Sequence, residues 1–319
     1  MIRKITILLS GTLAAKLLQF VYFFLAARIV SKEQFGIYAI LMTLFLIGLF
    51  PVLEWGSELI ITRNSATHDH MAFKTAMFWK WISFPFIFTA LGLYAIFQWN
   101  YPFPLVFVAG LLLLSRSIEQ SFFAYTRGLG ENKTEAIHLG ISRTISLSLL
   151  LSSHFFLTLS AFWVFTFQVV GSAVSLVIIH YFKLEIFTFA RPKKEELIHL
   201  LKEGAPLALT AISWLVFFKV DTLMIGRMLG ENEAGYYELG YKFLEASFLL
   251  PGVMMAILYR HLSMSVQSPA FKPHVLKSFA VLFTGGMIVM IAGKVIVPLI
   301  FPVFFREDQQ IVPVLFQTL

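Results

Sequence analysis

Charged side chains lie inside long apolar runs of this sequence, and their spacing indicates what they can do. The stretch VFFKVDTLMIGRMLG (216–230) places Lys219 and Asp221 two residues apart. Residues i and i+2 point about 200° apart on a helix, so these two charges cannot neutralise each other. A charge at the centre of a membrane helix costs about 2.5–3.5 kcal/mol. Both side chains therefore need a protein interior. We expect Lys219 to face a cavity, whereas Asp221 stays open between an ion pair and a functional role.

A second group of charges falls on one stripe of the apolar run 104–126. Arg116 lies near its middle, and Glu119, Gln120, Phe123 and Arg127 follow on the same face. Two interpretations fit this stripe: an Arg–Glu pair that joins two helices, or a cation that lines a pathway. Similar polar faces carry Lys16 in the run 5–30 and Arg143 in the run 137–157.

Acids at the same depth are fewer than cations. Glu54 and Glu58 share one face of the run 36–61, where they would form a proton or cation site, or would pair with Arg63 or Arg116. The ladder of Glu238, Lys242 and Glu245 at i, i+4 and i+7 satisfies itself and is expected to be structural.

The balance of these charges favours an anionic ligand. Lys16, Arg116 and Lys219 lie at mid-depth, with Arg143 closer to one end, and Asp221 is the acid of comparable depth. Because Arg and Lys bind phosphate groups well, the sequence predicts a pathway lined for a phosphorylated ligand.

The elements that must position these residues are membrane helices. Of the 319 residues, 58% are hydrophobic and 13% are charged, against about 25% charged in soluble domains. Apolar runs of about 20 residues cross a bilayer, and we place spans near 5–30, 36–61, 75–98, 104–126, 137–157, 160–182, 205–229, 235–259 and 277–304. A tenth begins near Ile311 and is cut off by the end of the chain, which suggests a truncated chain or a fragment.

Loop charges predict the orientation. Cations gather in alternate loops, around Arg63, Arg127, Arg191 and Arg260, whereas the opposite loops carry Lys32 and Arg306. By the positive-inside rule the N-terminus is cytoplasmic. The run after MIRK is longer than a signal-peptide core and is interpreted as a retained span. The cytoplasmic segment 184–204 looks amphipathic and is expected to link two bundles along the inner membrane surface.

An internal repeat supports two bundles. ARIVSKEQFGIYA (27–39) matches GRMLGENEAGYYE (226–238) at a constant offset of 199, which pairs Arg28 with Arg227, Gly36 with Gly235 and Tyr38 with Tyr237. An even number of spans separates the copies, so they share one orientation. Taken alone, each copy would indicate only a sequence that favours the start of a new helix. Because the two copies match at one constant offset, they indicate a parallel repeat.

Several kinds of chemistry find no support in the sequence. There is no Cys, no G-x4-G-K-[ST] and no H-E-x-x-H, so we expect no cofactor, no metal and no ATP hydrolysis by a P-loop. The net charge of +7 lies in short loops between spans, which argues against nucleic acid as a partner.

Two long segments resemble a known family. LLSGTLAAKLLQFVYFFLAARIVSKEQFGIYA and EGAPLALTAISWLVFFKVDTLMIGRMLGENEAGYYELGYKFLE are similar to the paired signature segments of polysaccharide-type (Wzx-like) flippases, in the multidrug/oligosaccharidyl-lipid/polysaccharide exporter superfamily. The family pattern of AP, D-T-L-M-[IL]-G and G-x-Y falls on Ala205-Pro206, Asp221 to Gly226 and Gly235 to Tyr237. The resemblance implies two six-helix bundles that move an undecaprenyl-diphosphate-linked oligosaccharide to the outer leaflet, driven by an ion gradient or the membrane potential.

These expectations define one hypothesis for the whole chain. We expect the chain to be an all-α polytopic membrane protein with a bundle at 1–183, a linker at 184–204 and an incomplete second bundle at 205–319. We expect it to act as a flippase of the bacterial inner membrane for surface polysaccharides such as O-antigen or capsule. It would work by alternating access beside polysaccharide polymerases and glycosyltransferases. Lys16, Arg116, Arg143 and Lys219 would attract the diphosphate.

The acids in the spans have an expected role, and two alternative functions remain open. Asp221, Glu54, Glu58 and Glu119 would serve ion coupling or pairing. The alternatives are a cation-coupled multidrug antiporter of the same superfamily, for which an acid-dominated central pocket is expected, and a membrane glycan polymerase or ligase. The short outer loops disfavour such an enzyme.

Overall fold

The chain is built from helices. The computed structural model describes residues 2–182 and 191–247 and short helical stretches between 275 and 295, and no strand occurs in these ranges. The helices are α1 (Ile2–Ile29), α2 (Lys32–Gly48), α3 (Phe50–Glu54), α4 (Ser57–Ser65), α5 (Met71–Trp99), α6 (Phe103–Gly128), α7 (Asn132–Ser153), α8 (Ala161–Phe182), α9 (Lys194–Leu229) and α10 (Glu231–Ser247). The predicted all-α class is confirmed.

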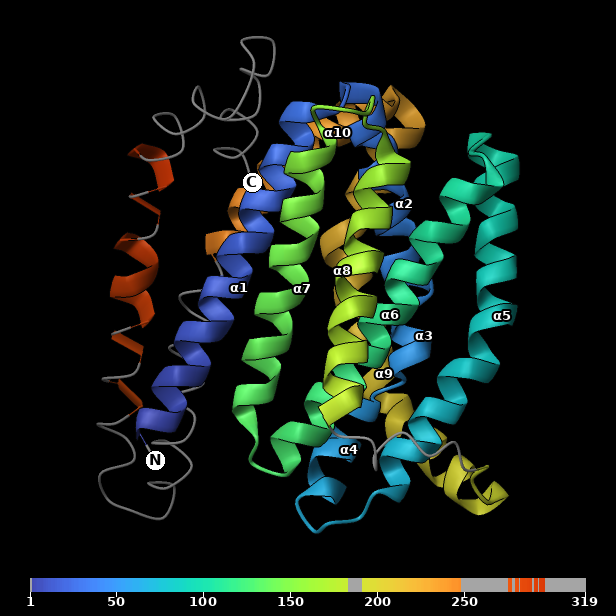
Figure 1. The fold of residues 1–319 in the computed structure, drawn as a ribbon, viewed down its shortest axis with the longest axis vertical. Helices are drawn as coiled ribbons and strands as arrows, with labels where there is room; N and C mark the ends of the chain where they lie inside the picture. Colours follow the sequence, from blue (N-terminus) through green and yellow to red (C-terminus); the bar gives the residue numbers. More distant parts are fainter. Residues whose placement is uncertain are drawn as a thin grey trace. The chain divides into compact units, whose positions relative to one another are not determined.

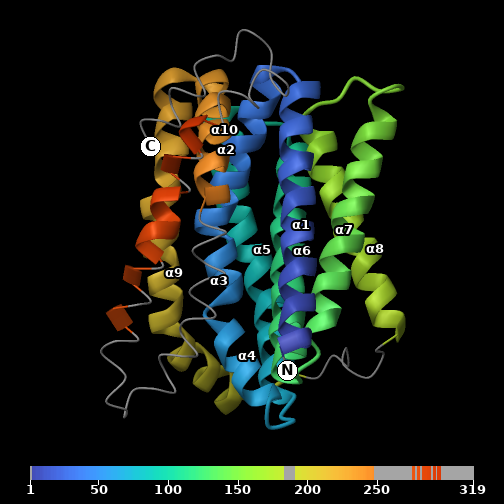
Figure 2. The ribbon, with the colours of Figure 1, turned by 90° about the vertical axis from the view of Figure 1, so that its left-hand side faces the viewer.

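Membrane-crossing helices fall where the apolar runs predict them. In the described part of the chain, five stretches are long and apolar enough to span a bilayer: Lys32–Ser65, Met71–Trp99, Phe103–Gly128, Ala161–Ile178 and Lys194–Leu229. Helices α1 and α7, which correspond to the expected spans 5–30 and 137–157, are not among these five stretches but stand beside them in the same bundle (Figures 1 and 2). The chain is therefore a multi-pass membrane protein. The expected spans 235–259 and 277–304 are only partly described, and the one near Ile311 lies outside the described residues.

Helix ends follow local signals in the sequence. Ser31 caps α2, since its Oγ accepts a hydrogen bond from the Gln34 backbone N–H at 3.3 Å. Asn100 ends α5 with a positive φ of 54°, which Asn tolerates better than most residues. Pro104 lies in the first turn of α6, where its missing N–H costs nothing. Short turns between these ends make successive spans antiparallel (Figure 1).

The chain divides into two compact units, Met1–Gly235 and Tyr236–Leu319. In the first unit α6 is the central helix, since it packs against α2, α3, α4, α5, α7 and α8, while α1 packs on α7. The start of α1, all of α4 and the first turns of α9 lie at one end of this bundle (Figure 1). This is the end that loop charges predict to be cytoplasmic, and the orientation itself stays a prediction.

The second unit is described over its first residues. There the Lys242 ammonium lies 3.2 Å from the Glu238 carboxylate and also bridges to Glu245, so the predicted self-satisfying ladder is confirmed.

The helix of the second span is interrupted, whereas the sequence predicts one continuous span at 36–61. Its continuous run from 36 to 61 is interrupted between α3 and α4, where Trp55 and Gly56 have positive φ values of 41° and 69°. Carbonyls near such a break need new donors. The indole Nε1 of Trp79 donates to Val52 O at 2.8 Å, and the Lys80 ammonium donates to Leu53 O at 3.2 Å. The break is therefore capped by side chains of α5.

Helix α9 is one continuous helix of 36 residues from Lys194 to Leu229, with Pro206 inside it. Within the segment 184–204, which is expected to be a linker along the membrane surface, residues 194–204 form the first turns of α9. The physical reason is that the Lys193 backbone N–H donates to the Glu196 carboxylate at 2.8 Å where the helix begins, and that one proline does not end the helix. Residues 184–190 lie outside the described residues, and the linker stays a prediction. The division into bundles at 183–205 stays a prediction.

Small residues let α9 lie close to the second span. A Cβ on Gly204 would lie 2.0 Å from Trp55 O, and a Cβ on Gly226 would lie 2.6 Å from the Ile40 side chain. Trp55 Nε1 also donates to Leu201 O at 2.9 Å. Near the other end, Arg227 donates to Gln98 O at 3.2 Å. The second span and α9 thus pack closely at Gly204 and at Gly226, and Arg227 also joins α9 to α5.

We expect Gly204→Ala to lower the melting temperature of the purified protein by several degrees, because its methyl group would push α9 away from the Trp55 carbonyl. Gly140→Ala in α7 is the matched control, since no atom lies within 4 Å of a Cβ built there. That variant should melt at the wild-type temperature or slightly above, because Ala favours a helix over Gly. Equal melting of both variants in a thermal-shift assay would contradict this packing.

The two copies of the repeat meet at their glycines. A Cβ on Gly36 would lie 1.7 Å from Glu231 O, and a Cβ on Gly235 would lie 3.2 Å from Gly36 N. Equivalent residues of two copies related by a two-fold rotation can touch only where the axis passes. The contact between positions separated by 199 residues therefore supports the predicted parallel duplication.

Candidate anion site in the first helix bundle

The polar stripe of α6 contacts a different helix at nearly every turn. Arg116 bonds to α8, Glu119 contacts α7 and α8, Gln120 reaches α4, and Arg127 reaches α4 and α7. Because α6 is central, this stripe places its charges inside the bundle rather than toward lipid.

Arg116 is held by a chain of polar groups and keeps donors to spare. Its Nη2 donates to Gln168 Oε1 at 2.6 Å, and Gln168 Nε2 donates to the Tyr38 hydroxyl at 3.1 Å. Its Nη1 has only the sulfur of Met42 at 4.0 Å, and its buried Nε has no hydrogen-bond partner. A guanidinium has five N–H donors, so Arg116 is oriented but incompletely satisfied.

Arg143 is the second cation of this interior. Its side chain is 7% exposed, and among the described residues no hydrogen bond or ion pair of Arg143 is found. The charges of Arg116 and Glu119, together with Tyr38 and Tyr22, act on it electrostatically. Two neighbouring guanidinium groups with unbonded donors repel each other and favour an anion between them. Arg116 and Arg143 are named here the arginine pair.

Glu54 is neutralised within the bundle. The fully buried Lys80 ammonium lies 2.8 Å from Glu54 Oε1, and Ser117 Oγ bonds to both at 2.7 Å. Arg63 or Arg116 was the partner expected from the sequence, and Lys80 takes that place in the structure. The sequence did contain a sign of this pairing, because Lys80 lies in the apolar run FWKWISF (78–84). A charged residue inside a membrane span is by default a candidate for an ion pair or a functional site.

Glu58 is also paired, with partners other than those expected. Its carboxylate lies 2.8 Å from Arg127 Nη2 and accepts a hydrogen bond from Gln120 Nε2 at 2.8 Å. Arg63 instead pairs with Glu203 at 2.7 Å. The break at Trp55–Gly56 is the physical reason, because it places Glu54 on α3 and Glu58 on α4, where the two face different neighbours.

The remaining sequence-predicted residues lie apart from the arginine pair. Lys16 is exposed on α1 and acts electrostatically on Glu135. On α9, Lys219 is buried with Thr222 and Gly226, whereas Asp221 is exposed with Phe217, so the predicted opposite faces of the two charges are confirmed. Because Gly226 contacts Ile40, the buried face of α9 packs on the second span. Lys219 and Lys16 as substrate cations stay predictions.

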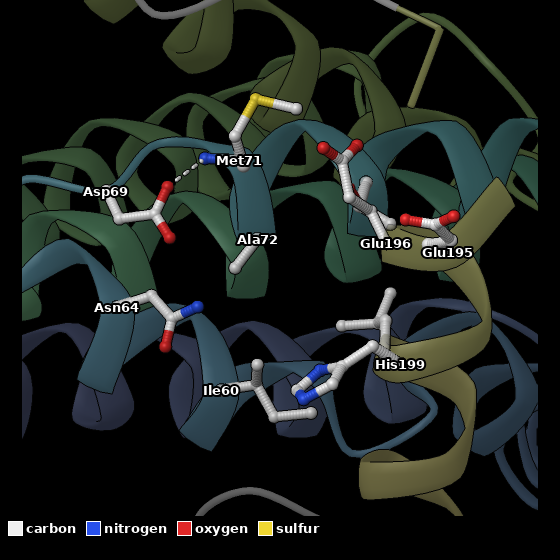
Figure 3. A pocket seen from close by; sticks show the side chains of 10 residues that line it. Ile60, Asn64, Asp69, Met71, Ala72, Glu195, Glu196 and His199 are labelled. Carbon is white, nitrogen blue, oxygen red and sulfur yellow. Dashed lines mark hydrogen bonds between the residues drawn. The ribbon is translucent and has the colours of Figure 1, made fainter. Parts of the chain in front are cut away.

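A pocket at the end of the bundle that carries α4 has the opposite character (Figure 3). It measures about 370 Å³ and is lined by Ile60, Asn64, Asp69, Met71, Ala72, Thr75, Glu195, Glu196, His199 and Leu200. Three carboxylates and no lysine or arginine line it, so it does not suit a phosphate. The arginine pair is the better match to the predicted anionic ligand.

Comparisons with known proteins agree with this architecture. The family described as polysaccharide biosynthesis protein matches residues 1–262. An outward-facing multidrug resistance MATE family transporter of the MOP superfamily has a TM-score of 0.62 at 13% identity, covering 99% of this chain and 77% of its own. A crystal structure of MATE in the straight conformation also has a TM-score of 0.62 at 13% identity, covering 100% and 77%.

No curated protein matches the sequence. The resemblance to polysaccharide-type exporters, first seen in the repeated segments, is confirmed over most of the chain. The chain belongs to the polysaccharide biosynthesis protein family and has the helical fold of a MATE-like transporter.

Proposed function

We propose that the chain moves a lipid-linked oligosaccharide diphosphate across the bacterial inner membrane, for the synthesis of a surface polysaccharide such as O-antigen or capsule. The observation that carries this proposal is the arginine pair. Arg143 is buried without a bonded acid, and Arg116 keeps an unbonded Nε. A diphosphate offers enough acceptor oxygens for both guanidinium groups.

The charges of the interior support an anionic rather than a cationic substrate. Glu54 is neutralised by Lys80, and Glu58 is neutralised by Arg127. Glu119 contacts His138 and acts on Arg143. Among the described residues, the sequence-predicted cations Arg116, Arg143 and the exposed Lys16 have no bonded acid. A multidrug antiporter for cations would favour the reverse balance.

The proposal places the chain among the machinery of polysaccharide assembly. Its substrate would come from glycosyltransferases that build an oligosaccharide on a polyprenyl diphosphate, and its product would pass to a polymerase outside. The N-terminus would be cytoplasmic, so the arginine pair would first meet substrate from the inner leaflet. No catalytic role for any residue is needed, since transport by alternating access breaks no bond.

Charge reversal tests the site in cells that depend on this chain for surface polysaccharide. Arg116→Glu and Lys219→Glu should each abolish surface polysaccharide while the membrane content of the protein stays at the wild-type level. Lys202→Glu is the control, because Lys202 is exposed in the first turns of α9. Normal polysaccharide in both charge-reversal strains would rule out the cation site.

A further inference from the structure

A buried acid and a buried histidine face each other beside the arginine pair. Glu119 on α6 is 3% exposed and His138 on α7 is fully buried. Glu119 Oε1 lies 3.1 Å from His138 Nε2 and also accepts a hydrogen bond from Ser172. On the other side of the ring, Ser175 Oγ lies 2.7 Å from Nδ1 and 3.0 Å from the His138 carbonyl oxygen. We call Glu119 and His138 the Glu–His pair.

The hydroxyl of Ser175 lets this pair hold two different numbers of protons. When Ser175 donates to Nδ1, the neutral imidazole carries its proton on Nε2, the ring nitrogen that lies 3.1 Å from Glu119 Oε1 without meeting hydrogen-bond geometry. When Ser175 donates to the His138 carbonyl, it accepts from Nδ1–H, and one more proton is needed between Nε2 and Oε1. Rotation of one O–H bond therefore accommodates the gain of a proton without moving a heavy atom.

The two states differ by one charge. With neutral His138 and ionised Glu119 the pair carries −1, and with the extra proton it carries 0. Glu119 acts electrostatically on Arg143. In the first state the negative charge of the Glu–His pair offsets the positive charge of Arg143. In the second state the Glu–His pair is neutral, and the positive charge of the arginine pair is no longer offset by it.

Charged or titratable groups lie on the helices that pack against α6 and α7, the two helices that carry the Glu–His pair. On α8, the polar neighbours Gln168, Ser172 and Ser175 are uncharged. Glu54, Glu58 and Lys80 are already bonded in ion pairs. These groups include Arg116 and Arg127 on α6, Glu135 and Arg143 on α7, Lys16 and Tyr22 on α1, Tyr38 on α2, Glu54 on α3, Glu58 on α4 and Lys80 on α5.

We propose that the Glu–His pair is a proton-binding site that controls the affinity of the arginine pair for a diphosphate. This inference rests on the proposed function. A proton on the pair removes the negative charge that competes with the ligand for Arg143, so binding strengthens. By linkage, a bound diphosphate raises the affinity of the pair for a proton to the same extent.

The test is the affinity of the purified full chain for farnesyl diphosphate, measured by calorimetry from pH 6 to pH 8.5. Wild-type affinity should fall as pH rises, by at most about tenfold per pH unit for one linked proton. Ionisation of the ligand itself acts in the opposite direction, since it adds negative charge at high pH. A wild-type affinity that stays constant or rises with pH would overturn the inference.

Two variants fix the pair in its two charge states. Glu119→Gln removes the negative charge and should bind tightly at every pH, whereas His138→Gln cannot take the proton and should bind at the weak, high-pH level throughout. His199→Gln is the matched control, because His199 faces Glu203 on the exposed surface of α9, and it should keep the wild-type pH profile. If His138→Gln keeps the wild-type slope, the pair is not the proton site.

The outcomes separate this inference from the proposed function. Binding of farnesyl diphosphate without the expected pH dependence would overturn the proton site and leave the anion site in place. Absence of binding to the wild-type protein at every pH would overturn both. The pH dependence of the wild-type affinity is measured without any variant. It therefore tests the inference even if a variant fails to fold.

Discussion

Replacing Lys80 with methionine is expected to lower the melting temperature of the purified protein by about 10 °C, because the change leaves the Glu54 carboxylate buried without its cation. Breaking a buried ion pair on one side costs about 3–5 kcal/mol, and each kcal/mol is about 2–4 °C for a chain of this size. The Lys80 ammonium is fully buried and bonds to Glu54, Leu53 O and Ser117. A thermal-shift assay in detergent measures the change.

The double variant Lys80→Met/Glu54→Leu separates charge pairing from the capping of the broken span. Removing both charges is often neutral, so the double variant should recover much of the loss. Leu53 O would still lack its donor, so recovery should be incomplete. Lys202→Met, at an exposed position of α9, should melt like the wild type. A Lys80→Met protein that also melts like the wild type would show that this pair does not stabilise the bundle.

Helix positions and helix faces could be predicted from the sequence, because both depend on local periodicity. The span 104–126 and its stripe from Arg116 to Arg127 correspond to α6 and to its polar contacts with α4, α7 and α8. The opposite faces of Lys219 and Asp221 follow from helix phase alone, and burial confirms them.

The partners of the charged residues could not be predicted, because they depend on how distant helices pack. Glu58 pairs with Arg127, 69 residues away, and Glu54 pairs with Lys80, 26 residues away. Helix phase indicates which way a side chain points, but not which helix stands opposite. A further difficulty is the break after Glu54, since Trp at a positive φ leaves no signal in the sequence.

The electrostatic interaction between Glu119 and Arg143 could not be predicted from the sequence, for the same reason. Both residues were candidates from sequence, but His138 and Gln168 were not, since a lone polar residue in an apolar run is ordinary in helix packing. Only the packing of α6, α7 and α8 brings Glu119, His138 and Ser175 together. The sequence therefore supports an anionic ligand, whereas the arrangement of the candidate site required the structure.

Replacing Arg143 with glutamine is expected to weaken binding of farnesyl diphosphate by about ten- to a hundredfold, because a hydrogen bond to a charged group contributes about 1.5–3 kcal/mol. Arg143→Lys keeps the charge but loses the planar fork, so it should recover only part of the affinity. Arg191→Gln is the matched control, since Arg191 is exposed just before α9. Wild-type affinity in Arg143→Gln, together with lost affinity in Arg116→Gln, would mean that Arg143 only compensates Glu119. In that case the diphosphate would rest on Arg116 and on cations of the second bundle, with Lys219 as the first residue to replace.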